Sequence, residues 1–227
     1  MKCFFLSASP LRQINGFTLL ELLAVVALMV VLATLAGSAW SGAAARADRI
    51  DALAKIRLMG AAVLQYSADH NSLLPPLFPG QVLEYEGGRG GRIVTECAEY
   101  LGISARTGKY LVEPLLPRAY ANLRAPADHN AMRVYVMNAA VTNGSAVLSP
   151  FGRVITGGQP PVGTSPLAAL AGAPAEQLWM LSTADQGQPN VAQAPWKSNT
   201  PTQPPLGDVR AVFRFNGSAA WEKVPPP

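Results

Sequence analysis

Residues 16–40 read GFTLLELLAVVALMVVLATLAGSAW, and this stretch decides the fold of the amino-terminal part of the chain. No charged side chain occurs from Leu22 to Ala45, a run of 24 residues rich in Leu, Val, Ala and Met. As a helix rising 1.5 Å per residue, this run would be about 36 Å long, enough to cross a hydrocarbon core of about 30 Å with some tilt. The run therefore predicts a helix that spans a bilayer.

A single carboxylate, Glu21, interrupts the apolar stretch. An ionised carboxylate in hydrocarbon costs at least ~2–3 kcal/mol, so such a group normally has a partner and a function. No basic side chain lies within one helical turn of Glu21. If the chain were cut between Gly16 and Phe17, the new amine of Phe17 would lie four residues before Glu21, on the same helix face. The amine of one subunit could equally pair with Glu21 of a neighbouring subunit.

A short basic leader precedes the apolar run, with two basic side chains and no acid in positions 1–16. Together with Gly-Phe-Thr-Leu-Leu-Glu at 16–21, this leader resembles the processing signal of type IV pilins and type II secretion pseudopilins. The resemblance implies that prepilin peptidase cuts after Gly16, that the amine of Phe17 is methylated, and that Glu21 orders subunits during assembly. It also implies a single pass through the inner membrane, with a cytoplasmic leader and an exported, periplasmic head.

An ordinary secretory signal is the alternative, since it also has a basic start, an apolar stretch and a cut site of small residues. Gly37-Ser38-Ala39 or Ala43-Ala44-Ala45 would supply that site. The apolar stretch is longer than the usual ~7–15 residues, and such a signal rarely contains an internal Glu, so the prepilin-type signal is favoured. The positive-inside rule would weakly favour the opposite orientation, because four basic side chains follow the span: Arg46, Arg49, Lys55 and Arg57.

The helix is expected to continue beyond the apolar run through residues 46–72, which contain no Pro and only one Gly. Apolar residues recur there at spacings of three or seven and predict a face that packs on a head: Ile50, Leu53, Ile56, Val63 and Tyr66. Pro75-Pro76 is expected to end the helix. The alternative is a break near Gly42, which would leave 46–72 as a separate amphipathic helix.

The remaining residues, 73–227, are long enough for one domain with its own core. Strand-like runs occupy three segments of it: 133–137, 177–181 and 209–215. Asn216-Gly217 follows the last run and precedes another strand-like segment at 218–224, a pattern typical of a tight hairpin. Two segments rich in Gly, Pro, Gln and Ser predict long loops: 157–174 and 187–207.

The predicted fold class is therefore α+β. A long amino-terminal helix, with a membrane-spanning first half and an amphipathic second half, is expected to pack on a small antiparallel β-sheet head with long loops. The expected divisions are a leader at 1–16, a transmembrane or filament-core helix at 17–45, its amphipathic continuation at 46–72, and an exported head at 73–227 that ends in a β-hairpin.

The side-chain chemistry argues against an enzyme and against a nucleic-acid partner. Charged residues make up 14% of the chain, against a usual ~25%, and the net charge of +4 comes without a run of Lys or Arg. The two histidines, His70 and His129, have no Cys or His at metal-ligand spacing, and no Gly-x-Ser-x-Gly elbow is present. The sequence thus predicts no catalytic residue and no cofactor.

Calcium is the one metal for which the sequence offers candidates. Asp185 and Asp208 border the 187–207 loop and are the only acids close to it. Calcium takes 6–8 oxygen ligands and normally several carboxylates, so solvated surface acids are the favoured interpretation of this pair. Cys97 would be the only thiol left after leader removal, and it is expected to fill a half-buried position.

The sequence is consistent with two functions. The favoured one is a structural subunit, a pseudopilin or minor pilin-like protein, of a type II secretion or type IV pilus-like filament. Its partners would be prepilin peptidase, other pilin or pseudopilin subunits and an inner-membrane assembly platform. The alternative is a membrane-anchored exported binding module that reads a polysaccharide or protein through the loops 157–174 and 187–207, with Trp179, Trp196 and Trp221.

Overall fold

The computed structural model describes residues 18–104, 106–121, 123, 132–153 and 162–224. The predicted leader therefore lies outside the described residues. The chain forms two compact units, residues 1–44 and residues 45–227. Helix α1 (Leu19–Asp69) begins in the first unit and ends in the second.

Within its described residues, the second unit has three antiparallel sheets and several short helices. Its strands are β1 (Gly80–Gln81), β2 (Glu84–Glu86), β3 (Lys109–Leu111), β4 (Tyr135–Met137), β5 (Val141–Asn143), β6 (Ala146–Leu148), β7 (Trp179–Thr183), β8 (Val209–Arg214) and β9 (Ala219–Lys223). Its helices after α1 are α2 (Ile93–Glu96), α3 (Arg118–Ala121) and α4 (Pro189–Ala192), with 3₁₀ turns at Glu113–Leu115, Leu167–Leu170, Ala175–Gln177 and Lys197–Asn199.

The main sheet has five strands in the order β1-β4-β7-β8-β9, and every neighbouring pair is antiparallel. The expected strands at 133–137, 177–181 and 209–215 correspond to β4, β7 and β8. The expected hairpin across Asn216-Gly217 is formed by β8 and β9, and Gly217 adopts the positive φ of 83° that such a turn requires. The α+β fold class is confirmed.

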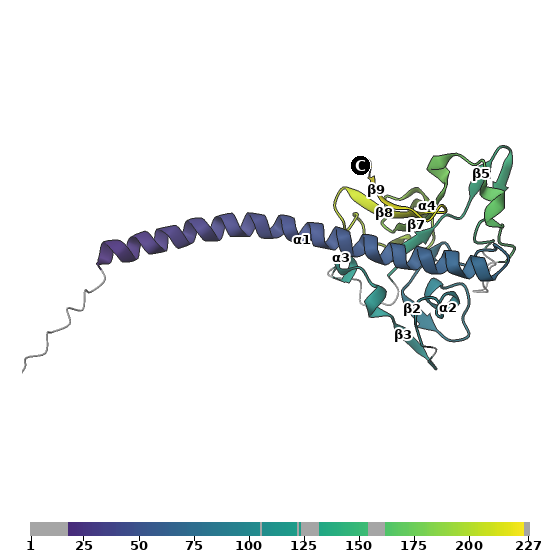
Figure 1. The fold of residues 1–227 in the computed structure, drawn as a ribbon, viewed down its shortest axis with the longest axis horizontal. Helices are drawn as coiled ribbons and strands as arrows, with labels where there is room; N and C mark the ends of the chain where they lie inside the picture. Colours follow the sequence, from purple (N-terminus) through teal and green to yellow (C-terminus); the bar gives the residue numbers. More distant parts are fainter. Residues whose placement is uncertain (1–17, 105, 122, 124–131, 154–161, 225–227) are drawn as a thin grey trace, which may run out of the picture. The chain divides into compact units, whose positions relative to one another are not determined.

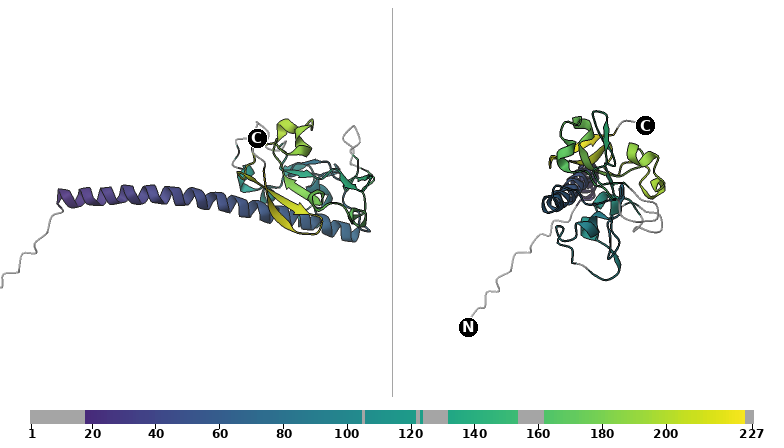
Figure 2. Two further views of the ribbon diagram at one scale, coloured as in Figure 1. Left: turned by 90° about the horizontal axis from the view of Figure 1, so that it is seen from above. Right: turned by 90° about the vertical axis from the view of Figure 1, so that its right-hand side faces the viewer.

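The part of α1 that belongs to the second unit lies between two groups of strands. Figure 1 shows β7, β8 and β9 on one side of it, and β2, β3 and α2 on the other. The two further views agree, with the yellow carboxyl-terminal strands running against the helix (Figure 2). One large core joins these layers, built from α1, α2, the main sheet and the β2–β3 hairpin.

The buried face of α1 is made by Ala52, Ile56, Met59 and Val63, spaced four, three and four residues apart. The predicted helical face is therefore only partly right. Ile56 and Val63 belong to it, and Leu53 and Tyr66 pack against the same core. Ile50, in contrast, is 68% exposed. Gly60 lies next to this face, and its missing side chain lets the Phe213 ring of β8 pack directly on the helix backbone.

The helix ends at Asp69, earlier than Pro75-Pro76 would require. Asn71 and Ser72 follow with positive φ angles of 53° and 62°, which turn the chain out of the helix. The Ser72 N–H then donates to the carbonyl of Ser67 at 2.9 Å, so one of the free carbonyls of the last turn is satisfied.

Gly60 sits where α1 touches β8. A Cβ at this position would overlap the ring of Phe213. We therefore expect Gly60→Ala to destabilise the head by about 1–3 kcal/mol through overpacking, even though Ala is better than Gly in a helix by about 1 kcal/mol. Thermal unfolding of the full chain in detergent, followed by near-ultraviolet circular dichroism, measures the loss.

The matched control for this substitution is Gly42→Ala, on the same helix. Apart from its chain neighbours and the nearby helix backbone, no atom of the described residues lies within 4 Å of the position that a Cβ on Gly42 would occupy. This change is therefore expected to leave the unfolding temperature unchanged or slightly raised. Phe213→Leu in the Gly60→Ala background is expected to recover part of the loss. Equal unfolding temperatures for the Gly60 and Gly42 variants would contradict close packing of α1 on β8.

The outer face of the main sheet, away from α1, carries a second and smaller core. Val136 of β4 packs there with Ala184 and Val191, and the half-buried rings of Trp179 and Trp196 complete the cluster. The expected 187–207 loop therefore folds onto the sheet through α4 and the 3₁₀ turn after Trp196.

Among the described residues, no helical stretch combines the length and the apolar character needed to cross a membrane.

Candidate functional site

The amino-terminal motif is described from Thr18 onward, so Gly16 and Phe17 lie outside the described residues. Thr18 and Glu21 form reciprocal hydrogen bonds at the start of α1. The Glu21 carboxylate accepts from the Thr18 backbone N–H and from its hydroxyl, both at 2.9 Å, and the Glu21 N–H donates to Thr18 Oγ1 at 3.2 Å. This is a capping box, which satisfies backbone donors that a helix start leaves free.

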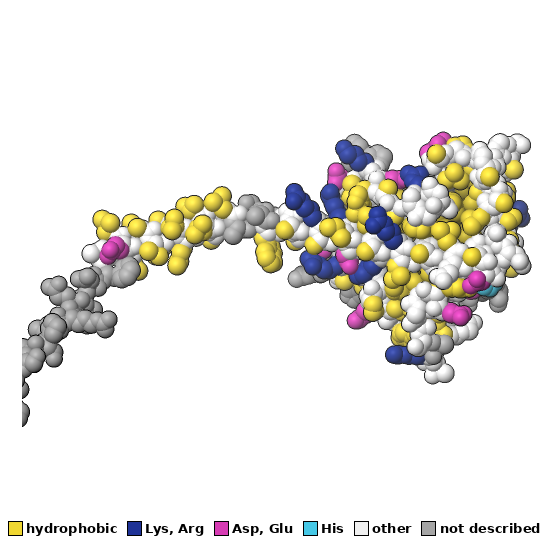
Figure 3. All heavy atoms as spheres, in the orientation of Figure 1, with side chains coloured by type: hydrophobic (Ala, Val, Ile, Leu, Met, Phe, Trp, Pro, Cys, Tyr) yellow, Lys and Arg dark blue, Asp and Glu magenta, His cyan; other side chains and the backbone are white. Residues whose placement is uncertain are grey.

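Beyond this cap, the first unit presents an apolar helix surface. The large side chains from Leu19 to Leu35 are more than two-fifths exposed, and they surround the helix rather than forming one stripe. Figure 3 shows hydrophobic side chains along this part of α1. An apolar surface of this extent marks a site of contact with lipid or with other proteins.

The two calcium candidates are held by different arginines. Asp185 is 1% exposed, and its carboxylate accepts from Arg210 Nη2 at 2.7 Å, from Arg210 Nε, and from the Gly187 N–H at 2.9 Å. Asp208 is mostly exposed and pairs with Arg49 Nη2 at 2.9 Å, while Arg49 Nε donates to the Leu206 carbonyl. The structure therefore does not join the two carboxylates in one site.

Other titratable side chains singled out in the sequence have structural partners or fall outside the description. The ring of His70 stacks on Tyr66, with 3.8 Å between ring centroids, and His129 lies outside the described residues. Burial, followed by the charge of Glu96, raises the pKa of the Cys97 thiol, which makes it a poor nucleophile. Within the part of the chain that the structure describes, no three His, Cys, Asp or Glu side chains are grouped to hold a metal ion.

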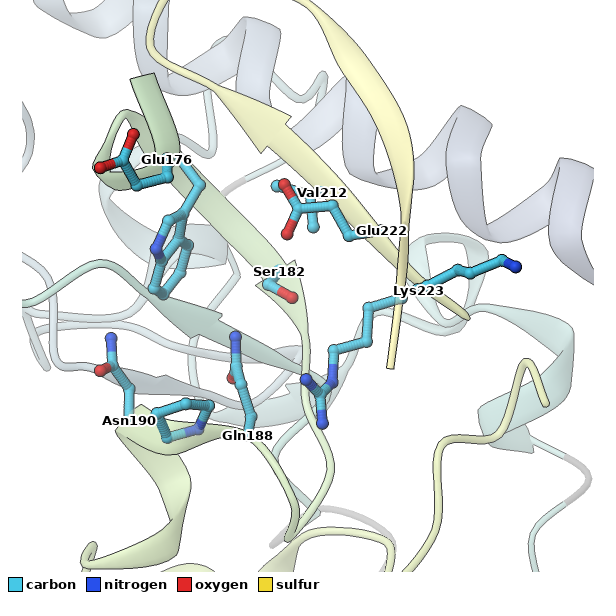
Figure 4. Close-up of a pocket in the computed structure, with 10 residues that line it drawn as sticks. Glu176, Ser182, Gln188, Asn190, Val212, Glu222 and Lys223 are labelled. Carbon is cyan, nitrogen blue, oxygen red and sulfur yellow. The ribbon is translucent and has the colours of Figure 1, made fainter. Parts of the chain in front are cut away.

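A pocket of about 210 Å³ opens on the outer face of the main sheet. Its base is formed by Ser182 of β7 and Val212 of β8, and its wall by Trp179. Figure 4 shows Gln188 and Asn190 on one side of the pocket, with their amides directed toward the sheet. Pro189, Arg210, Glu176, Glu222 and Lys223 complete the lining.

Strand alternation explains why the pocket is polar. Val209, Ala211 and Phe213 of β8 point into the main core, so Arg210 and Val212 point to the outer face. The Arg210 guanidinium is fixed there by Asp185, and Glu222 on β9 is fixed by Arg214 at 2.6 Å. The ionic groups nearest the base of the pocket are thus already paired.

The phenol of Tyr120 supports the Asp185 segment from inside the core. Its hydroxyl donates to the Ala184 carbonyl at 2.7 Å. Burial, and then the charge of Asp185, raises the pKa of Tyr120, so the phenol remains a neutral donor. The position of Asp185 is therefore set by two neighbours, Tyr120 through the backbone and Arg210 through the carboxylate.

The three tryptophans proposed from the sequence do not share one surface. Trp179 lines the pocket, and Trp196 packs in the small core beside it, so close to β1 that a Cβ on Gly80 would come within 2.7 Å of the Trp196 ring. Trp221 pairs with Ala211 across β8 and β9. Directly opposed residues share a face, so Trp221 lies on the α1 side of the sheet. The amides of the pocket carry no sequence signal, because Gln188 and Asn190 stand in a polar segment with Gly and Pro that matches no motif.

Comparison with known families gives one match. Residues 11–37 match the family model described as the prokaryotic N-terminal methylation motif. Neither the curated proteins nor the solved structures include a significant match to this chain.

Proposed function

Because the chain carries the signature of type IV pilins and pseudopilins, we propose that it is a structural subunit of a type II secretion or type IV pilus-like filament. The observation that carries this proposal is the methylation motif at 11–37, which includes the exposed apolar start of α1. Families with this motif are structural rather than enzymatic, so the proposed work is mechanical.

In this proposal, prepilin peptidase removes residues 1–16 and the amine of Phe17 is methylated. The uncharged run from Leu22 to Ala45, taken from the sequence, anchors the precursor in the inner membrane. The leader faces the cytoplasm and the head is exported to the periplasm. An assembly platform then draws the subunit out of the membrane into a filament.

Packing of like helices would cover the apolar surface in the filament. Leu19 to Leu35 present Leu, Val and Met side chains on all sides, as a helix surrounded by lipid or by other helices does. Glu21 is the one charged group of this segment, and it would pair with the amine of Phe17 of a neighbouring subunit. This pair would align subunits along the filament, because an unpaired carboxylate in the apolar bundle is unfavourable.

Mass spectrometry of the amino terminus of the purified protein tests the proposal. The expected result is a chain that begins with methylated Phe17. An ordinary signal peptidase would instead leave Trp40 or Arg46 as the first residue, and either outcome would overturn the proposal. Expression in cells that lack prepilin peptidase is the matched control, and there the chain is expected to keep residues 1–16.

A further inference from the structure

We propose that the pocket between α4 and the outer face of the main sheet binds a carbohydrate, one sugar ring at a time. The pocket belongs wholly to the second unit, and the inference does not depend on filament assembly.

The first observation is a mostly buried amide that makes no side-chain hydrogen bond among the described residues. Gln188 is only 6% exposed, and its Oε1 is shielded from solvent and has no partner there. A buried polar atom without a partner costs about 1–3 kcal/mol, so the amide is not kept for its contribution to the fold. Because Oε1 is shielded, the Nε2 end of this pocket-lining amide is the group that a ligand can reach (Figure 4).

The second observation is the pairing of the charges. Arg210 is held by Asp185 and Glu222 by Arg214, so neither is free to bind an ion as its main partner. Glu176 and Lys223, the other two charged residues of the lining, have opposite signs. The pocket thus lacks the cluster of free cations that a phosphate requires, and the grouped acids that a metal requires. Its ligand is expected to be neutral.

The third observation is the mixture of donors and acceptors beside an aromatic wall. The Gln188 and Asn190 amides offer N–H groups to an acceptor, whereas Glu222 can accept through the carboxylate oxygen that Arg214 does not bind. Neighbouring hydroxyls on one sugar ring supply both functions, because each hydroxyl can donate and accept. The half-buried ring of Trp179 provides a flat apolar surface for the C–H face of the sugar.

The size of the pocket fits one ring. Its volume of about 210 Å³ is below the ~300–1,000 Å³ of pockets that enclose drug-sized ligands. A single ring would fill it, and the rest of a chain would leave past the exposed rim at Glu176 and Lys223. Both a glucan and an N-acetylhexosamine polymer present this chemistry, so the test includes both.

Saturation-transfer NMR on the full chain tests the proposal, in a detergent that has no sugar headgroup. The probes are maltotriose, cellotriose and chitotriose at millimolar concentration, with inorganic phosphate as the charged comparison. At least one trisaccharide is expected to show transfer with a millimolar Kd. Absence of transfer to all three, or binding of phosphate that depends on Gln188, would overturn the proposal.

The variant that locates the site is Gln188→Met. It keeps the side-chain length but removes the amide, and the expected loss of affinity is about tenfold. Because the change also removes a buried orphan acceptor, the unfolding temperature is expected to stay the same or rise. The matched control is Gln193→Met, at an exposed position just after α4 that does not line the pocket, with no change in binding expected.

A second variant covers the case in which Gln188→Met fails to fold. Asn190 is exposed, so Asn190→Ala should leave stability unchanged while weakening binding several-fold. If both Gln188→Met and Asn190→Ala bind the trisaccharide as the parent chain does, the proposed site is wrong.

Discussion

Asp185→Asn is expected to destabilise the head by about 3–5 kcal/mol, because it leaves the Arg210 guanidinium buried without its counter-charge. The pair is bidentate, and both side chains are almost fully buried. For a domain of this size the loss corresponds to a fall in Tm of roughly 10 °C. Urea titration of the full chain in detergent, followed by near-ultraviolet circular dichroism, measures it.

Asp208→Asn is the matched control, since it also removes an aspartate from an arginine pair. The Arg49–Asp208 pair is solvated, with 68% of the Asp208 side chain exposed, and such pairs contribute about 0–1 kcal/mol. The double variant Asp185→Leu with Arg210→Met is expected to recover most of the loss, because no buried charge remains. Equal losses for Asp185→Asn and Asp208→Asn would show that burial does not distinguish the two pairs.

Glu21→Gln is expected to lower incorporation into filaments about tenfold or more while leaving cleavage after Gly16 intact. The amide can still accept hydrogen bonds from Thr18, so the helix cap is kept, but the charge that would attract a neighbouring amine is lost. Immunoblots of sheared filament and membrane fractions measure incorporation. Mass spectrometry of the same samples measures processing.

Thr18→Ala separates the two roles of this carboxylate. It removes the capping box, which costs about 1 kcal/mol of helix stability, but leaves the charge of Glu21 in place. Near-normal incorporation of Thr18→Ala beside failure of Glu21→Gln is the pattern expected for charge pairing. The reverse pattern would assign Glu21 a role in capping alone.

Local patterns made part of this fold predictable. The helix and the hairpin across Asn216-Gly217 depend on neighbours within a few residues, so composition and spacing were enough to predict them. The buried face of α1 was less predictable, because it depends on the close approach of Phe213 to Gly60. Spacing alone placed Ile50 on that face, and the structure exposes it.

Long-range pairing limited the prediction of the sites. From the sequence alone, Asp185 is interpreted as a solvated loop acid. In the fold, the pairing of β7 and β8 brings Arg210, 25 positions later, beside it. The pocket likewise needs β7, β8, β9 and α4 together, and none of these segments contains a motif for it. The amino-terminal motif could be recognised from the sequence because its six key residues are consecutive in the chain.

The contact between helix α1 and strand β8 also determines when, during synthesis of the chain, the helix becomes covered. The partner of Arg49 is Asp208, 159 positions later in the sequence, and the Phe213 ring that covers Gly60 emerges later still. At the usual rate of chain synthesis, ~5–20 residues per second, this part of the helix would stay exposed for on the order of ten seconds or more before β8 is made. A chain shortened before Val209 would lack the Phe213 ring that lies on Gly60, and this part of α1 would be open to proteases. Synthesis of β8 and β9 is thereby a condition for a protected head.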